Sequence, residues 1–250
     1  MKIAFCFFGI TRSLKYTIDS IRQNIFGEWD NSDYTIFLHT YNLNNYRNKR
    51  ANEKSNNVNN DEYKLLKPDY FEIDDQDEIK KKINMTLYRT HKDPWNTNYN
   101  SVDNFILAQY SKSRLVNMIA KTNNNYDYIV FLRPDCMYFD KLSINLFSRV
   151  NDNSISIPNW HLYGPYKFND RFCITNMKTY KIYGDVFKDL LDISKKSILH
   201  SETVLGNIIY KEKLNVNRTN FKFSRIRMNG LRNKLDFPNL KFKIFVKTIL

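Results

Sequence analysis

The sequence predicts an α/β protein with a mostly parallel central sheet flanked by helices. Two apolar runs, Ile3–Phe8 and Tyr34–Leu38, are separated by a stretch with helical spacing, Leu14–Ile25, which is the strand–helix–strand unit of a parallel sheet. A long amphipathic segment, residues 101–120, leads into a third apolar run, Tyr128–Leu132. Hydrophobic residues make up 42% of the 250-residue chain, which is enough to bury a sizeable core.

The first strand and helix have clear boundaries in the sequence. Ile3–Phe8 is rich in phenylalanine and is closed by Gly9, a pattern typical of a strand buried on both faces. In the following segment Leu14, Ile18, Ile21 and Ile25 recur at helical spacing. Ser13 stands where an N-cap is expected.

The rest of the chain is mixed. Residues 42–61 are rich in Asn and Lys and predict a long surface loop. Further strands are expected at residues 68–73, 137–139, 155–157 and 171–175, and further helices at 74–83, 101–120, 176–193 and 201–214. We expect one domain over residues 1–214 and a basic C-terminal extension over 215–250 that packs on it or on a surface, with an edge strand or interfacial segment among Leu240–Val246.

The charge of the chain is strongly positive and uneven. Lys and Arg number 39 against 26 Asp and Glu, which gives +13. The last 36 residues hold nine Lys or Arg and one acid, Asp236, so +8 of the +13 lies there. Such a basic end can bind nucleic acid, a membrane surface or an anionic small molecule, or can be a solvated tail.

Cysteine usage and hydropathy indicate the compartment. Cys6, Cys136 and Cys173 are an odd number without CxxC spacing, which argues against a disulfide framework or a zinc site. We expect them to be small core residues in a reducing compartment. No apolar run reaches the roughly 18 residues of a spanning helix. The N-terminal run is at the short end of the range for a signal peptide and no small-residue cleavage pattern follows it, so it is expected to be the first strand. A soluble cytoplasmic protein is expected.

Polar residues follow three of the expected strands at their carboxyl ends. They are Gly9–Arg12, His39–Tyr41 and Arg133–Asp135. Ligands of open α/β sheets bind outside the carboxyl ends of the strands. The sequence therefore predicts that these segments meet around one crevice, with Arg12 and Asp135 on the same side of the molecule.

Taken together, several motifs resemble those of GT-A-type glycosyltransferases. They are a strand closing on Gly9-x-x-Arg12-Ser13, the segment Phe37-Leu38-His39-Thr40-Tyr41, a helix containing Gln109 and Ser113, the run from Tyr126-Asp127 to Arg133-Pro134-Asp135, the segment Asn169–Phe172 and His200-Ser201-Glu202. The set is similar to compact glycosyltransferases predicted in giant viruses and bacterial surface-polysaccharide loci. The resemblance covers residues 2–210 and implies a GT-A-like catalytic domain over 1–214.

The resemblance implies a nucleotide-sugar donor site. In such enzymes a DxD motif after a core strand binds Mg²⁺ or Mn²⁺, which bridges the donor phosphates. The matching position here reads Arg133-Pro134-Asp135, so only Asp135 can be a metal ligand and Arg133 can pair with phosphate instead. The donor-binding residues implied are Gly9, Thr11, Arg12, His39, Gln109, Ser113, Arg133 and Asp135.

The same resemblance implies the remaining site residues. Asp170 or Glu202 is the expected base for the acceptor hydroxyl. Trp160 and Arg171 are expected acceptor-binding residues, and His200 would complete a metal shell. Structural alternatives stay open for several of these residues: ion pairs that hold the loop for Arg133 and Asp135, a helix cap at Glu202, and core packing for Trp160.

The function expected is transfer of a sugar from a nucleotide sugar to a glycan, lipid-linked or protein acceptor. A membrane-surface contact through the basic C-terminus is compatible with this function, and nucleic acid is not an expected partner of the enzyme. Two alternatives stay open. One is a basic module that binds nucleic acid or a membrane surface through Lys222, Arg225, Arg227, Arg232 and Lys234. The other is an inactive relative of the glycosyltransferases. Sugar, base, acceptor, linkage and stereochemistry are not readable from the sequence.

Overall fold

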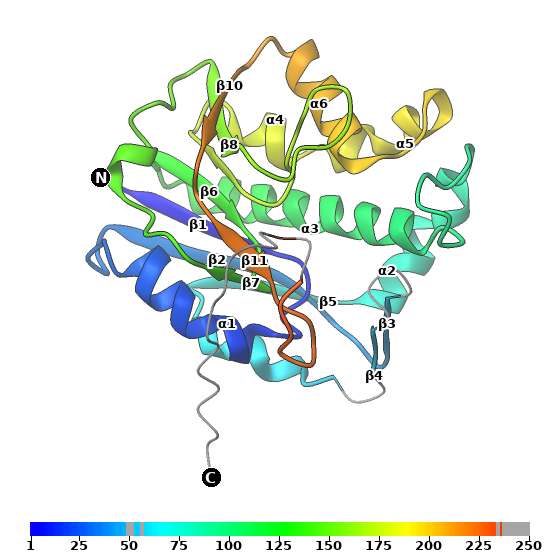
Figure 1. Ribbon diagram of the computed structural model, residues 1–250, viewed down its shortest axis with the longest axis horizontal. Helices are drawn as coiled ribbons and strands as arrows, with labels where there is room; N and C mark the ends of the chain where they lie inside the picture. The colour runs from blue at the N-terminus through cyan, green and yellow to red at the C-terminus, as the bar shows by residue number, and fades with distance from the viewer. Residues whose placement is uncertain (49–52, 56–57, 234–235, 237–250) are drawn as a thin grey trace.

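A seven-stranded sheet forms the centre of the molecule in the computed structural model, which describes residues 1–48, 53–55, 58–233 and 236 (Figure 1). The strand order is β10-β8-β9-β6-β1-β2-β5. Every pairing is parallel except those of β9, which is antiparallel to both β6 and β8. The sheet strands are β1 (Ile3–Phe8), β2 (Tyr34–Asn42), β5 (Tyr70–Asp75), β6 (Tyr128–Leu132), β8 (Ser154–Pro158), β9 (Cys173–Thr175) and β10 (Asn215–Thr219). The predicted mostly parallel α/β fold is confirmed.

Strand β1 lies in the middle of the sheet and explains the apolar run at the N-terminus. It pairs in parallel with β2 on one side and with β6 on the other, and all six of its residues are buried. Its side chains alternate: Ala4, Cys6 and Phe8 pack into one core, and Ile3, Phe5 and Phe7 pack into the other. Because both faces are covered by helices, the strand carries no polar alternation.

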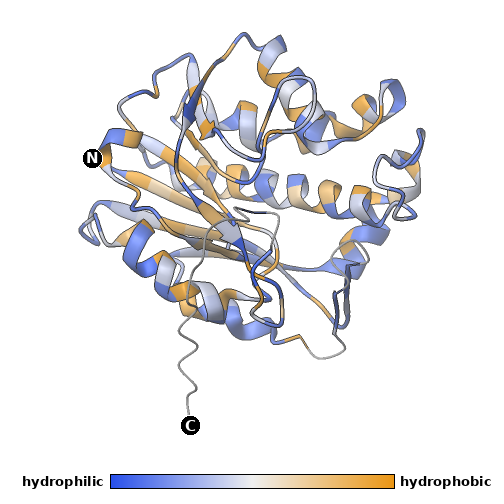
Figure 2. Ribbon diagram, in the orientation of Figure 1, coloured by the Kyte–Doolittle hydropathy of each residue, from blue (hydrophilic) through white to orange (hydrophobic). Residues whose placement is uncertain are grey.

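Helices cover the two faces of the sheet (Figure 1), with their apolar sides turned inward (Figure 2). Helix α1 (Leu14–Ile21) covers one face. The other face is covered by the long helix α3 (Asn100–Thr122) together with α4 (Tyr180–Gly184), α5 (Phe187–Lys196) and α6 (Ser201–Lys211). Helix α2 (Gln76–Ile83) follows β5 directly. Short turns of other helix types complete the described chain at Arg22–Phe26, Asn60–Leu66, Met85–Tyr88 and Ile144–Leu146.

Two small two-stranded sheets lie outside the main sheet. Strand β7 (Cys136–Tyr138) pairs antiparallel with β11 (Phe223–Arg225). Strand β3 (Tyr46–Asn48) pairs antiparallel with β4 (Glu53–Ser55). The expectation of a plain surface loop over residues 42–61 is therefore wrong, since Tyr46 is buried and Glu53 carries a nearly buried carboxylate.

Two other boundaries also differ from the sequence-based expectation. Strand β2 continues to Asn42, so His39 lies within a strand and not at its end. The single helix expected over 176–193 is two helices, α4 and α5. A Cβ on Gly184 would come within 2.6 Å of both Phe131 and Val116, so α4 ends in close contact with the sheet and with α3, and α5 begins after Asp185 and Val186.

Part of the expected C-terminal extension belongs to the fold. Residues 215–219 form the edge strand β10, and 223–225 form β11. The domain boundary at residue 214 stays a prediction, and the expected segment Leu240–Val246 lies outside the described residues. The three cysteines are free and buried, as predicted. Among the described residues, no helix is long and apolar enough to span a membrane.

Candidate functional site

A cavity of about 280 Å³ opens at the carboxyl ends of the central strands. Its wall includes Gly9 and Arg12, which follow β1, and Arg133 and Asp135, which follow β6. The chain leaves β1 toward β2 on one side of the sheet, and β6 lies on the other side, so the cavity is at the point where the strand order reverses. Open α/β sheets bind their ligands at this point.

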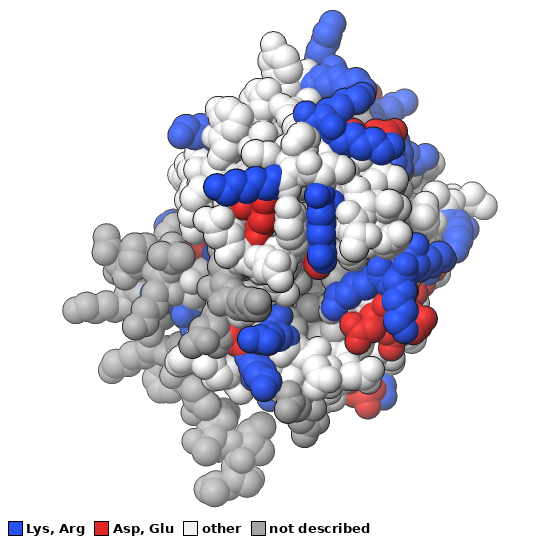
Figure 3. Space-filling model, turned by 90° about the vertical axis from the view of Figure 1, so that its right-hand side faces the viewer, with Lys and Arg blue, Asp and Glu red and all other residues white. Residues whose placement is uncertain are grey.

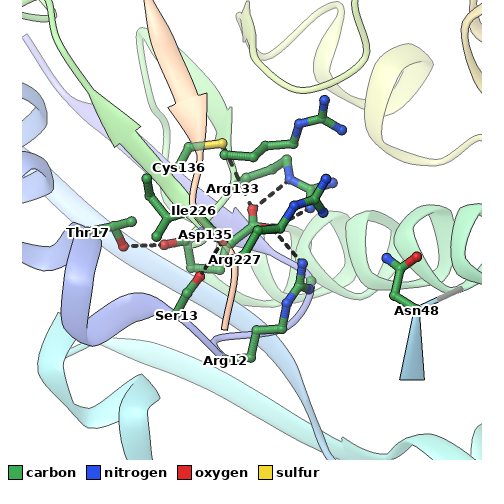
Figure 4. Close-up of polar contacts among 12 residues, drawn as sticks. Arg12, Ser13, Thr17, Asn48, Arg133, Asp135, Cys136, Ile226 and Arg227 are labelled. Carbon is green, nitrogen blue, oxygen red and sulfur yellow. Dashed lines mark hydrogen bonds and ion pairs between the residues drawn. The ribbon is translucent and has the colours of Figure 1, made fainter. Parts of the chain in front are cut away.

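Asp135 is at the centre of an arginine cluster (Figure 4). Its Oδ1 accepts from Arg133 Nε at 2.8 Å and its Oδ2 accepts from Arg133 Nη2 at 2.7 Å, a bidentate pair. Arg12 Nη2 lies 3.5 Å from the same Oδ2. Although burial alone would raise the pKa of Asp135, these guanidinium groups hold it far below its ordinary value. The predicted meeting of Arg12 and Asp135 is therefore confirmed.

Helix α1 and β11 fix the backbone on either side of Asp135. Thr17 Oγ1 donates to the carbonyl oxygen of Pro134 at 2.6 Å. The amide of Ile226 donates to the carbonyl oxygen of Asp135 at 2.8 Å, and Ser13 Oγ donates to the carbonyl oxygen of Ile226 at 3.0 Å. Ser13 is the residue before α1, as predicted, but its hydroxyl donates to Ile226, the residue after β11, and does not cap the helix.

Three more arginines line the cavity, and each has an acidic neighbour. Arg225 Nη2 lies 2.9 Å from Asp236, Arg227 Nη1 lies 3.3 Å from Glu53, and Arg171 Nη2 lies 3.8 Å from Glu202. Among the arginines that line the cavity, two have a guanidinium nitrogen that is buried without a hydrogen-bond partner, Nε of Arg12 and Nη1 of Arg171. Buried donors of this kind are usually satisfied, so these two nitrogens are candidates to bind a ligand with acceptor oxygens.

Asp170 and Glu202 form a pair of carboxyl groups with opposite pKa shifts. Burial would raise the pKa of Asp170, but Arg171, Lys112 and Arg133 outweigh it and the pKa lies below its ordinary value. Burial, followed by the negative charge of Asp170, raises the pKa of Glu202. Neighbouring carboxyl groups whose pKa values are driven apart are typical of acid–base sites.

Lys112 supports this pair from beneath the cavity. It lies on α3, is 1% exposed, and its ammonium has no hydrogen-bond partner. Its Nζ is 4.2 Å from the ring centre of Tyr183 and 4.8 Å from that of Phe8. Burial lowers its pKa to about 8, against the opposing charge of Asp170. A positive charge is thus held below Asp170 largely by ring faces.

The residues around Asp135 do not suit a divalent metal ion. Both carboxylate oxygens of Asp135 already accept from Arg133, and Arg12 is the next nearest charge. His200, the other predicted ligand, stacks on Trp95 and has its Nδ1 3.0 Å from Thr203 Oγ1. Over the described parts of the chain, no three His, Cys, Asp or Glu side chains are grouped as a metal site. A cation at Asp135 would meet guanidinium charges where Mg²⁺ and Mn²⁺ need oxygen ligands.

Eight of the predicted site residues line the cavity: Gly9, Arg12, Arg133, Asp135, Asp170, Arg171, His200 and Glu202. Five do not. Thr11, His39 and Gln109 are almost fully buried, Ser113 Oγ donates to Asp185, and Trp160 Nε1 donates to the carbonyl oxygen of Phe221 while its ring packs on Phe223. The roles predicted for these five stay predictions, and the cavity gives them no support.

Several residues at the cavity were not predicted. Ser111 Oγ accepts from the amide of Gly9 at 2.9 Å and lies 2.9 Å from His39 Nδ1, so it ties β1 and β2 to α3. Tyr46 packs under the guanidinium of Arg12, whose Cζ is 4.6 Å from its ring centre. Glu53 pairs with both Arg12 and Arg227. Tyr46 is a large aromatic residue, a type that is often buried, but the Asn-rich sequence around it favoured the prediction of a surface loop.

No protein-family model matches the sequence, and no curated protein matches it either. Solved structures with a similar fold include the apo form of the glycosyltransferase GlyE of Streptococcus pneumoniae, at 12% identity and a TM-score of 0.42 over 86% of this chain. Mouse xyloside xylosyltransferase 1 in its apo form is 10% identical, with a TM-score of 0.44 over 87%. The galactosyltransferase LgtC in complex with donor and acceptor sugar analogues is 12% identical, with a TM-score of 0.43 over 88%.

The lengths of these proteins differ. The chain spans 44% of GlyE, 84% of the mouse enzyme and 73% of LgtC.

Proposed function

We propose that the chain is a glycosyltransferase that moves a sugar from a nucleotide-sugar donor to a hydroxyl acceptor. The observation that carries the proposal is the shared cavity, in which buried guanidinium groups with unsatisfied N–H groups lie beside two carboxyl groups of opposite pKa shift. Binding of a diphosphate requires the guanidinium groups, and substitution at the anomeric carbon of the adjacent sugar requires the two carboxyl groups.

The arginines receive the leaving group. In the reaction the acceptor oxygen bonds to the anomeric carbon, while the bond from that carbon to the diphosphate oxygen breaks and its electron pair leaves with the nucleoside diphosphate. Arg12 and Arg171 each offer a buried donor without a partner, and such donors bind phosphate oxygens with strong, charge-assisted hydrogen bonds.

The two carboxyl groups have different tasks. Asp170 is kept ionised by Arg171, Lys112 and Arg133, so it can face the positive charge that develops at the anomeric carbon. Glu202 has a raised pKa, which makes it a stronger base than an ordinary carboxylate, and it takes the proton from the acceptor hydroxyl.

In this proposal, arginine side chains of the protein balance the negative charge of the diphosphate leaving group. Because Asp135 is held by Arg133 and Arg12, its part is to orient those guanidinium groups and not to bind Mg²⁺ or Mn²⁺. The nucleotide sugar is the donor, and the acceptor is a hydroxyl group of a glycan, a lipid-linked molecule or a protein. The three buried free cysteines fit a reducing compartment, so the cytoplasm is the proposed location.

The basic-module alternative finds less support. Of its five residues, Arg225 and Arg227 line the cavity and pair with acids, and Lys234 lies outside the described residues. On the face shown in Figure 3, red acidic side chains lie against blue basic ones in several places. A nucleic-acid site requires a basic surface that follows the phosphate backbone.

Hydrolysis of a panel of nucleotide sugars tests the function. We expect the wild-type protein to release the sugar from at least one donor, and Asp170→Asn to slow this release about a hundredfold or more. Glu202→Gln should slow it and flatten its rise with pH. Asp19→Asn is the control, because Asp19 has a side chain that is 97% exposed on α1. Absence of hydrolysis with every donor, or equal rates for Asp170→Asn and Asp19→Asn, would refute the proposal.

A further inference from the structure

Three exposed tyrosines extend from the cavity, and we call them the tyrosine surface: Tyr163 and Tyr166 lie on one hairpin, and Tyr210 stacks on Tyr166. Tyr163 lines the cavity and is 41% exposed, Tyr166 is 37% exposed and Tyr210 is 73% exposed. The rings of Tyr166 and Tyr210 stack with their centres 5.9 Å apart and an interplanar angle of 27°. Large aromatic side chains usually have a buried face, so a stacked pair left in solvent beside a cavity is informative.

The segment that carries two of these tyrosines is firmly held. Tyr163 and Phe168 exchange two backbone hydrogen bonds of 2.9 Å, which close a tight hairpin. Its turn uses Gly164, at φ +70°. Arg218 on β10 donates to the carbonyl oxygen of Lys167 at 2.7 Å and to that of Tyr166 at 3.2 Å. The rings are therefore presented by a fixed backbone.

Helix α6 aligns the surface with the carboxyl groups of the cavity. Glu202, Gly206 and Tyr210 are spaced by four residues and lie along one side of the helix. Tyr166 packs directly on Gly206, where a Cβ would come within 2.6 Å of its ring. The glycine thus makes room for Tyr166 between Glu202 and Tyr210. From Glu202 to Tyr210 the helix rises about 12 Å, so the tyrosine surface leads outward from the cavity.

We propose that this tyrosine surface binds the acceptor, and that the acceptor is a carbohydrate chain. The inference rests on the proposed function, since it selects a glycan from among glycan, lipid-linked and protein acceptors. Tyrosine rings are apolar on their faces and polar at the hydroxyl, which matches the apolar face and hydroxyl rim of a sugar ring. A chain lying on Tyr210 and Tyr166 would place its end at Tyr163 and Glu202, where the acceptor hydroxyl is needed.

The surroundings favour a sugar over a protein partner. Lys167, Lys211 and Lys213 are exposed next to the tyrosines, so the tyrosine surface is not part of a continuous apolar patch. Trp160, the aromatic residue expected from the sequence to stack on a sugar, is in the same stretch of chain but packs on Phe223. We therefore assign the stacking role expected for Trp160 to the tyrosines of the hairpin that follows it.

Binding to an array of purified glycans, from monosaccharides to longer oligosaccharides, tests the inference. We expect the wild-type protein to retain at least one class of glycan, with affinity increasing with chain length. Tyr210→Ala should weaken this binding about tenfold, a loss of about 1.4 kcal/mol, without changing the melting temperature, because Tyr210 is largely exposed. Tyr166→Phe should retain binding, because it keeps the ring.

Tyr70→Ala is the matched control. Tyr70 is 42% exposed and stacks on another ring, that of Phe37, but lies at the beginning of β5, away from the carboxyl ends. If the wild type binds no glycan on the array, or if Tyr210→Ala binds as tightly as Tyr70→Ala, the inference is wrong. Hydrolysis of nucleotide sugars by the wild-type protein is measured separately. A protein that hydrolyses a donor but binds no glycan overturns this inference alone, whereas a protein that hydrolyses no donor overturns the proposed function.

Discussion

At the scale of single residues, Asp135 shows how one substitution within a motif changes its chemistry. In the motif that this segment resembles, the acid two residues before it would be a metal ligand, and here that position is Arg133. Its guanidinium group takes both oxygens of Asp135. In this protein the carboxylate of Asp135 therefore orients Arg133 and Arg12 at the cavity.

Asp135→Asn should destabilise the protein by roughly 3–5 kcal/mol, because it removes the buried carboxylate that pairs with Arg133 and Arg12. The free energy of unfolding in urea measures this. Asp135 has a depressed pKa, so its stabilising effect is present above the ordinary pKa of an aspartate and is lost as the pH falls. The wild-type protein should therefore lose more stability than the variant on acidification. Equal loss in both would contradict the assignment.

Lys112→Met should raise stability at neutral pH, because it removes a buried charge without a hydrogen bond. The pKa of Lys112 is lowered to about 8, below its unfolded value near 10.4, so the unfolded chain binds more protons between these values. Wild-type stability should thus rise from about pH 8 to 10.4, and this rise should be absent in Lys112→Met. A variant that is less stable than the wild type, or in which stability still rises between these pH values, would contradict this account of Lys112.

The sequence predicted the charged residues at strand ends better than it predicted the buried polar ones. Arg12, Arg133 and Asp135 follow apolar runs directly, so their position at the sheet edge could be inferred. Ser111 and Lys112 lie within an amphipathic pattern on α3, where periodicity does not reveal that polar side chains turn inward. Their environment is created by β1 and by α4, which are distant in sequence.

At the scale of elements, close contacts at glycines explain where helix prediction failed. The helical pattern over 176–193 was read as continuous, but Gly184 brings α4 against Phe131 and Val116, and the chain starts a new helix at Phe187. The spacing of apolar residues indicates which side of a helix is apolar, but it does not indicate how closely the helix packs against its neighbour. Strands β3, β4 and β11 were missed because each has only three residues, whereas β7 was expected within one residue of its position.

Gly184→Ala should cost about 1–3 kcal/mol, because the added methyl group would meet two buried side chains at 2.6 Å. Gly206→Ala is the matched comparison. The three atoms nearest its methyl group would all belong to Tyr166, which is 37% exposed, whereas those at Gly184 belong to buried side chains, so the cost in unfolding free energy should be smaller. Thermal or urea unfolding of both variants decides this. A larger cost at Gly206 would mean that the hairpin at residues 163–168 is a structural support of α6.

At the scale of the whole molecule, the order of the strands determines where the charged groups meet. Strands β1 and β6 are neighbours although more than a hundred residues separate them, and both point to the same edge. The sequence allowed this to be expected from the parallel-sheet pattern. It did not show that residues 223–233, expected in a basic extension, would return to the cavity and supply Arg225 and Arg227.

Calorimetric titration with a panel of nucleoside diphosphates, with Mn²⁺ and with EDTA, tests the central claim that arginines alone hold the diphosphate. We predict that one nucleotide binds equally well under both conditions and that Arg171→Met weakens it by about tenfold or more. Arg22→Met, which changes an arginine whose side chain is 52% exposed at the end of α1, should bind like the wild type. Binding that requires Mn²⁺, or that is unchanged in Arg171→Met, would contradict the account.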